Sequence, residues 1–213
     1  LDRLTALVGR QHGRLLQLLR ELQDSVRTRE HLASLQQELD IARRIQRATL
    51  PRRPPPVPGL VLQATMEPAR EVGGDFYDWF LLDEHRLAVA VADVSGKGVP
   101  AAFFMAVART LLRTTARYVT EPAAVLARLN DELAADNDET LFVTLFYAVL
   151  DLRSGRLECV NAGHNPPLLR RADGNVQPLP RGRNPILAVW PGQRFHADRG
   201  TLAPGDGLLL YTD

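Results

Sequence analysis

The sequence predicts an α+β fold in which antiparallel sheets are covered by helices and one long helix precedes them. Segments typical of strands follow one another through short turns, without a helix after each, which excludes a doubly wound parallel sheet. Residues 1–49 contain no proline and repeat leucine at three- and four-residue spacings. That spacing is typical of a long helix with a coiled-coil seam.

Three parts are expected along the chain. Residues 1–49 are interpreted as a signalling and dimerisation linker helix, whose leucine pattern weakens near residues 27–30 and then resumes. The alternative is an amphipathic helix that lies on its own domain, but the length favours the linker. Prolines in residues 50–59 end the helix and predict a semi-rigid spacer. Residues 60–213 form the globular domain.

Within the globular domain, the pattern predicts strands joined by short turns and two helices. The first helix is expected over residues 99–117, with Pro100 in a tolerated first-turn position. Its almost wholly apolar character predicts that it is buried. The second is expected over residues 121–136, with Thr120 as its cap. The strand segments are residues 60–66, 74–82, 86–93, 142–151, 156–162, 166–171, 194–201 and 206–212.

Composition limits the class of partner and the compartment. The net charge of +1 gives no general attraction to nucleic acid or to an anionic membrane. No apolar run approaches the roughly 20 residues that a membrane span needs. The single cysteine, Cys159, cannot form an internal disulfide, which favours a reducing, cytoplasmic compartment. The chain begins with Leu1 and ends after a strand-like run, which suggests an excerpt from a longer protein.

Two aspartates are expected to face each other across a hairpin. If residues 74–82 and 86–93 turn about Glu84, three apolar pairs form and the next pair in register is Asp75 with Asp93. Two opposed carboxylates destabilise a sheet unless a shared proton or a cation compensates. Mg²⁺ and Mn²⁺ prefer clustered carboxylates, so the pair predicts a divalent metal site. Asp78 falls on the opposite face of the strand and is left out.

A nucleotide-binding switch is the alternative for the loop that follows Asp93. A phosphate-cradling loop requires G-x-x-x-x-G-K-[ST] between strand and helix. Here Gly98 stands where Ser or Thr must follow the lysine, and Val91 stands near the first glycine position. The sequence therefore excludes this kind of loop, and Lys97 is left as a candidate contact for a substrate phosphate.

With these residues in place, the chain resembles the SpoIIE/RsbU-like bacterial branch of the PPM metal-dependent serine/threonine protein phosphatases. The resemblance covers about residues 35–213 and rests on LDIARRIQRATLP, EVGGDFYD, VADVSGKGVPAAFFM, VNAGHNPPLL and LLLYTD, in that order. It implies a four-layer α/β/β/α sandwich of two antiparallel sheets flanked by helices. It also implies two Mn²⁺ or Mg²⁺ ions and a metal-bridging water that attacks the phosphorus.

The resemblance assigns roles motif by motif. Asp75 and Asp93 would be catalytic metal ligands, with Asp93 the candidate that bridges both ions. The backbone carbonyl of Val94 and the carboxylate of Asp213 would be further ligands. Members of the family carry one more aspartate further along, and this chain ends before reaching it, so the domain is expected to be incomplete at its C-terminus.

Three residues are candidates for contact with the substrate phosphate: Arg70, Lys97 and His164. Arg70 lies just upstream of the first aspartate, as a phosphate-holding arginine does in eukaryotic relatives, although a solvated arginine is the simpler interpretation. His164 lies among turn-forming residues, which favours a structural role. Ser95 replaces the histidine that is the proposed general acid of those relatives, so water would supply the leaving-group proton.

The resemblance further implies a pathway. The substrate would be a phosphorylated STAS-domain anti-anti-sigma factor in a partner-switching system. An upstream sensor domain would regulate the enzyme through the N-terminal helix, which would also form a homodimer. The alternative is a catalytically inactive binding scaffold on the same fold, against which the costly carboxylate pair argues.

Overall fold

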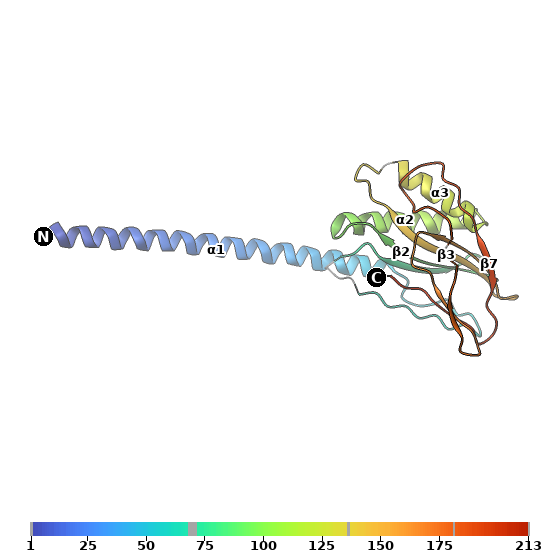
Figure 1. The fold of residues 1–213 in the computed structure, drawn as a ribbon. Helices are drawn as coiled ribbons and strands as arrows, with labels where there is room; N and C mark the ends of the chain where they lie inside the picture. The colour runs from blue at the N-terminus through green and yellow to red at the C-terminus, as the bar shows by residue number, and fades with distance from the viewer. Residues whose placement is uncertain (1, 68–71, 136, 181, 213) are drawn as a thin grey trace. The chain divides into compact units, whose positions relative to one another are not determined.

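The chain is analysed in a computed structural model, which describes residues 2–67, 72–135, 137–180 and 182–212 (Figure 1). It divides into two compact units, Leu1–Arg44 and Ile45–Asp213. The first unit is helical, and the second contains the sheets and the remaining helices.

Helix α1 runs over Asp2–Thr49 without interruption, so the long helix predicted at the start of the chain is present. The helix also continues through residues 27–30, where the leucine pattern weakens. In the single chain its apolar side chains are exposed to solvent, among them Leu15, Leu18, Leu22, Leu32 and Leu35. A coiled-coil partner is what usually covers such a seam.

A five-stranded antiparallel sheet has the order β1-β2-β3-β4-β7. Its β2 shows the alternation expected of a strand that separates two layers, since Ala88, Ala90 and Ala92 are fully buried on one face while Val89 and Val91 lie on the other. The bounds are β1 Phe76–Leu81, β2 Arg86–Val94, β3 Val143–Asp151, β4 Arg156–Ala162 and β7 Asp198–Thr201.

A second antiparallel sheet has the order β6-β5-β8, with β5 over Leu168–Arg170, β6 over Val176–Pro178 and β8 over Gly207–Leu209. Strand β6 was not expected from the sequence, because its three residues are exposed and carry no burial pattern. The strand predicted over residues 60–66 is wrong, since this segment has no regular structure. Its apolar pattern reflects the side chain of Leu60, which packs against the core between the sheets, and not strand pairing.

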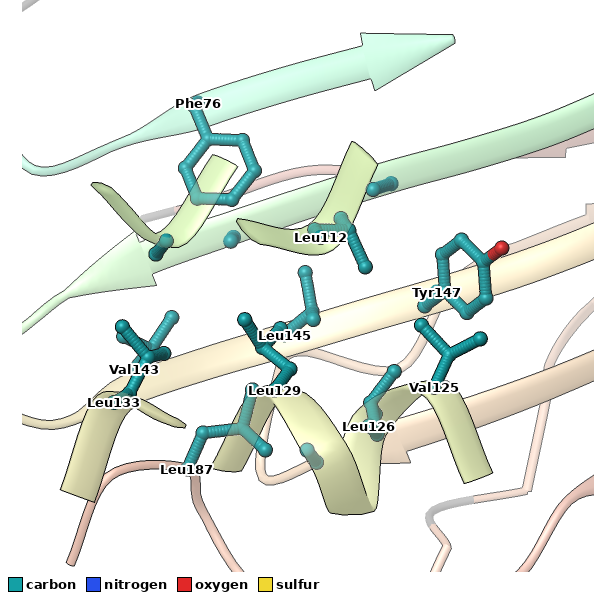
Figure 2. Close-up of a cluster of buried hydrophobic side chains, with 14 of the residues drawn as sticks. Phe76, Leu112, Val125, Leu126, Leu129, Leu133, Val143, Leu145, Tyr147 and Leu187 are labelled. Carbon is teal, nitrogen blue, oxygen red and sulfur yellow. The ribbon is translucent and has the colours of Figure 1, made fainter. Parts of the chain in front are cut away.

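Helices α2, over Val99–Tyr118, and α3, over Pro122–Ala135, pack on one face of the five-stranded sheet. Figure 2 shows Leu112 of α2 and Leu126 and Leu129 of α3 pointing towards Leu145 and Tyr147 of β3. The sequence predicts that the almost wholly apolar helix α2 is buried, and for one face of the helix this prediction is wrong. Val99, Phe103 and Val107 are exposed, because a helix in an outer layer buries only the stripe that faces the sheet.

Helix α3 begins one residue later than its predicted cap implies. The backbone N–H of Val125 donates to the carbonyl of Glu121 at 3.0 Å, so Glu121 occupies the position before the first helical residue, Pro122. Thr120 is therefore not the cap. The shift follows from Pro122, because proline is favoured at the first helical position.

The two sheets enclose a second core. Phe146, Leu150 and Leu157 of the five-stranded sheet pack against Leu208 and Leu179 from the side of the other sheet. The α+β class with two antiparallel sheets is confirmed, and the described elements supply one helical layer and both sheets. A helical layer on the outer face of the second sheet is not among the described elements. In the described part of the chain, every helix is too short or too polar to cross a membrane.

Candidate active site at the ends of the first two strands

The β1–β2 hairpin brings Asp75 and Asp93 to one end and one face of the five-stranded sheet. The predicted register is confirmed: Leu81 pairs with Leu87, Trp79 with Val89 and Tyr77 with Val91. The ladder ends with the pair Phe76 and Ala92. Asp75 is the residue just before this pair and Asp93 the residue just after it, so continuing the register sets the two carboxylates opposite each other.

Asp93 is also positioned from its other side. It pairs with Thr144 of β3 in the antiparallel register. The hydroxyl of Thr144 lies 2.8 Å from Nδ1 of His164, which follows the end of β4. Asp93 of β2, Thr144 of β3 and His164 after β4 therefore follow one another across neighbouring strands of the sheet.

His164 itself is buried, with 5% of its surface exposed. Its backbone N–H donates to Oδ1 of Asn161 at 2.7 Å, and Nδ2 of Asn161 donates to the carbonyl of His164 at 3.1 Å. These bonds close the turn that the sequence predicts in this segment. Burial and turn geometry both support a structural role for His164 over a contact with substrate.

Gly74 brings the chain before Asp75 into close contact with Val94. A Cβ atom on Gly74 would lie 2.5 Å from the carbonyl oxygen of Val94 and 3.0 Å from its Cβ, closer than real side chains come. Only glycine therefore fits here without a shift. The contact gathers Asp75, Asp93 and the carbonyl of Val94, the three predicted ligands among the described residues, at one place.

The end of the described chain also reaches this place. The hydroxyl of Thr212 donates to Oδ2 of Asp75 at 2.9 Å. Thr212, in the last described part of the chain, therefore lies next to the first aspartate. Two predicted site residues, Asp213 and Arg70, lie outside the described residues.

The loop after Asp93 is anchored by Ser95. Its backbone N–H donates to the carbonyl of Phe142 at 2.8 Å, and its hydroxyl accepts a hydrogen bond from the N–H of Phe142 at 2.8 Å. Gly96 and Gly98 have φ angles of 88° and 75°, in the region that favours glycine. Lys97, between them, is exposed to solvent on the loop that follows Asp93.

Asp78 lies on the face of β1 opposite to that of Asp75, as the sequence predicts. Its ion-pair partners were not predicted from the sequence. The side chain is fully buried, and its Oδ2 lies 3.0 Å from Nε of Arg109 and 2.8 Å from Nε of Arg113. Burial raises the pKa of Asp78, and the two guanidinium groups oppose that rise. The sequence feature that could have predicted these partners is the spacing of Arg109 and Arg113, which lie one turn apart in a largely apolar helix. The cluster joins α2 to β1, the strand that begins after Asp75.

Gln46 is the second residue that sequence reasoning missed, although it lies in the quoted motif LDIARRIQRATLP. Its side-chain Nε2 donates to the carbonyl of Gly73 at 2.5 Å, and its Oε1 accepts from the N–H of Gly73 at 3.2 Å. Gln46 is therefore hydrogen-bonded to both backbone groups of Gly73, two residues before Asp75.

A cavity of about 360 Å³ adjoins Asp75. Its walls come from β1, β2, the irregular segment after the proline-rich stretch and the chain after β8, and include Met66, Tyr77, Val91, Leu210 and Thr212.

The donor atoms fit a hard divalent cation, although the described part of the set is incomplete. Among the residues that the structure describes, no three His, Cys, Asp or Glu side chains form a group that could hold a metal ion. Asp75, Asp93 and the Val94 carbonyl offer oxygen atoms alone, which suits Mg²⁺ or Mn²⁺. The absence of a side chain at Gly74 lets the chain before Asp75 approach that carbonyl closely. Asp213 would be the remaining carboxylate.

Comparison with known families and sequences gives one consistent result. The SpoIIE family model, described as Stage II sporulation protein E, matches residues 83–213. Protein IcfG of Synechocystis is 32% identical over 203 residues, which cover 83% of this chain and 32% of that protein. Phosphoserine phosphatase RsbU of Bacillus subtilis is 27% identical, with 84% of this chain and 53% of that protein covered. The chain thus spans about half, or less, of the length of these curated relatives.

Solved structures share the fold. The SiaA-PP2C domain of Pseudomonas aeruginosa has a TM-score of 0.70 at 24% identity and covers 83% of this chain and 70% of that one. The RsbU and RsbW domains of Rv1364c from Mycobacterium tuberculosis give a TM-score of 0.61 at 32% identity, covering 68% of this chain and 40% of that one.

Proposed function

The chain belongs to the SpoIIE family of PP2C-type phosphatases, and from that premise we propose that it is a metal-dependent phosphoserine/phosphothreonine protein phosphatase. The observation that carries the proposal is the placement of Asp75 and Asp93 at the end of one hairpin, in register and on one face. A scaffold has no need of two opposed carboxylates, because their repulsion destabilises the hairpin unless a cation lies between them.

Each residue has a proposed part in the reaction. Two Mn²⁺ or Mg²⁺ ions, held by Asp75, Asp93, the Val94 carbonyl and Asp213, would supply an activated water and neutralise charge on the phosphoryl group. Asp93 would hold both ions and Asp75 one of them. Lys97, exposed on the loop after Asp93, would attract the substrate phosphate, and Arg70 is a second candidate for that contact.

Thr212 and Gly74 prepare the carboxylate and carbonyl ligands before substrate binds. Thr212 holds one oxygen of Asp75 and leaves the other to bind a cation. Gly74 permits the close contact that keeps the Val94 carbonyl beside Asp75. Groups held in place in this way need no rearrangement during the reaction, which lowers its barrier. Ser95 stands where the eukaryotic relatives carry the histidine proposed as general acid, so the leaving-group proton would come from water.

We infer a phosphorylated STAS-domain protein as the substrate, in a partner-switching pathway in the cytoplasm. The inference is supported by relatives named phosphoserine phosphatase RsbU and phosphoserine phosphatase RsbP. It is also supported by the M. tuberculosis protein, in which RsbU and RsbW domains occur together. Nucleic acid is not a proposed partner, because the net charge is only +1.

Regulation is proposed to reach the site through helix α1. Its exposed leucine seam would pair with a second copy of the chain, and an upstream sensor domain would change the register of the two helices. Cysteine pairs introduced along the seam can lock the dimer in different registers. The natural cysteine does not interfere, because Cys159 is buried. The expected result is a phosphatase rate that depends on the register, whereas equal rates in every register would make α1 a tether.

The function is tested by Mn²⁺-dependent phosphate release from a phosphoserine STAS protein, with the full-length protein that contains this chain. Asp93→Ala should abolish release, and Asp138→Ala, a change at an exposed aspartate, should leave it unchanged. Release that is undiminished in Asp93→Ala would mean that the site lies elsewhere. A folded wild-type protein that releases no phosphate in any locked register would favour the scaffold alternative.

A further inference from the structure

We propose that Thr144 and His164 are a pair of positioning residues for Asp93, an inference that rests on the proposed function. The hydroxyl of Thr144 lies 2.8 Å from Nδ1 of His164, and Thr144 is the residue of β3 that pairs with Asp93 of β2. In this role the two side chains hold the Asp93 carboxylate in the orientation that binds the metal ions, and they are neither metal ligands nor contacts of the substrate.

The side chains of Asp93 and Thr144 lie on the face of the sheet that is turned away from the helices. Val94, next to Asp93, and Leu145, next to Thr144, both belong to the core under the helices. Because side chains alternate along a strand, Asp93 and Thr144 point the other way. Directly opposite residues on one face have Cβ atoms about 4.5–5.5 Å apart, so the hydroxyl and the carboxylate are neighbours.

The imidazole that contacts Thr144 is held in place by the turn after β4. Both backbone groups of His164 bond the side chain of Asn161, and the two residues are only 5% and 4% exposed. Gly163 lies between them with a φ of 71°, and a Cβ atom there would collide with the side chain of Ile186. The turn therefore has little freedom where it presents the imidazole to Thr144.

The core between the sheets does not require a polar pair at this place. Further along the same face of β3, Phe146, Ala148 and Leu150 pack into that core. Two apolar side chains in place of Thr144 and His164 would continue it, and replacing both partners of a hydrogen bond by apolar groups of similar shape costs little stability. What distinguishes this end of the face is the neighbouring carboxylate, which supports a role for the pair in holding it.

Asp93 needs a fixed orientation because it is the residue proposed to hold both ions. Each of its oxygen atoms must then face a cation, and a rotation of the carboxylate turns both oxygens away at once. A free hydroxyl rotates to suit its surroundings. The hydroxyl of Thr144 is bound to the imidazole, so it has a fixed place beside the carboxylate and limits that rotation. Removing residues that orient metal ligands in this way typically weakens metal binding by about 10–100-fold.

The test measures Mn²⁺ affinity by isothermal titration in the full-length protein that contains this chain. Thr144→Val and His164→Leu should each weaken the affinity by about tenfold. The double variant should weaken it no further, because the two side chains act through one contact. Thr144→Ser keeps the hydroxyl and should bind Mn²⁺ as the wild type does.

Stability separates this role from a merely structural one. Urea denaturation of the metal-free double variant should give a free energy of unfolding close to that of the wild type, because the hydroxyl and the imidazole are removed together. Two control variants should keep wild-type Mn²⁺ affinity. One is Thr114→Val, whose hydroxyl bonds the carbonyl of Thr110 in its own helix at 2.9 Å, and the other is His85→Leu, in the turn between β1 and β2.

Three results would overturn the role of the pair: wild-type Mn²⁺ affinity in Thr144→Val, additive losses in the double variant, or an equal loss in Thr144→Ser. If the variants of His164 do not fold, the comparison of Thr144→Val with Thr144→Ser decides alone. A wild-type protein that binds no Mn²⁺ overturns the proposed function and this role with it. Unchanged affinity in the variants of an active enzyme overturns this role and leaves the proposed function standing.

Discussion

The hydroxyl of Thr212 donates a hydrogen bond to the carboxylate of Asp75 at 2.9 Å, across a separation of 137 residues in the chain. The bond brings the segment that precedes Asp213 to the segment that precedes β1. The predicted metal set requires this meeting, because it draws one carboxylate from each segment. Thr212 therefore tests the geometry of the proposed centre without removing a ligand from it.

Thr212→Val should weaken Mn²⁺ affinity by about fivefold, because a hydrogen bond to a charged group contributes on the order of 1 kcal/mol or more. The rate at saturating Mn²⁺ should change little, since valine keeps the shape and the ligands remain. Thr110→Val is the control, as that hydroxyl bonds only a carbonyl of its own helix, Ala106 at 2.7 Å. Equal Mn²⁺ affinity in both variants, measured by isothermal titration, would contradict the prediction.

Gly74→Ala should lower both stability and metal affinity. The added Cβ would lie 2.5 Å from the carbonyl oxygen of Val94, so the backbone must move. Overpacking of this kind costs about 1–3 kcal/mol in the free energy of unfolding, which urea denaturation measures. Gly200→Ala is the control in β7, where nothing lies within 4 Å of the added atom. A Gly74→Ala protein as stable as Gly200→Ala would show that the contact with Val94 is looser than described.

Asp78→Asn should destabilise the protein by about 3 kcal/mol, because it leaves two guanidinium groups beside a buried, uncharged partner. The groups are those of Arg109 and Arg113, with 11% and 34% of their side chains exposed. Asp83→Asn changes the ion pair with Arg86, which lies in solvent, so a much smaller change is expected in the same urea titration. Similar losses in the two variants would mean that the cluster under α2 contributes no more than a surface pair.

Cys159 should be unreactive in the folded protein. Burial raises the pKa of its thiol from 9.0 to about 11, so the thiolate that attacks a disulfide reagent is scarce at pH 8. Reaction with a chromogenic disulfide should be slow in buffer and fast in urea. Equal rates would show that the space between the sheets opens readily.

The same shift predicts a dependence of stability on pH. The unfolded chain loses the thiol proton near pH 9, and the folded chain keeps it until about pH 11. The contribution of the thiol to stability is therefore complete below pH 9 and declines as the pH rises from 9 to 11. Cys159→Ala should show a shallower decline over this window, measured by urea denaturation at each pH.

Much of the fold could be predicted because it follows from local patterns. The alternation of apolar residues in β1 and β2, with a turn about Glu84, determines the register and hence the position of Asp75 opposite Asp93. The proline-free leucine repeat determines helix α1 in the same way. Both patterns reflect the period of one element, which a sequence displays directly.

Other features were missed or predicted wrongly, because an apolar sequence pattern indicates that a segment is buried but not which element it packs against. The apolar residues of the segment 60–66 predict a strand, but the segment is irregular and Leu60 packs into the core between the sheets. The short strand β6 is exposed and so has no pattern to find. Helix α2 reads as buried on all sides, although the sheet covers only one of its faces.

The sequence by itself determined the family, the long helix and the aspartate pair, because each is visible in short motifs or in the period of a single element. Only the tertiary structure decided that Gln46 holds Gly73, that Thr212 holds Asp75 and that Asp78 binds two arginines of α2. The two residues of each pair lie far apart in the chain. A polar side chain could form hydrogen bonds with many other residues, and the sequence does not show which one it meets. Packing of the layers selects one of them by bringing it within hydrogen-bond distance and excluding water from the rest.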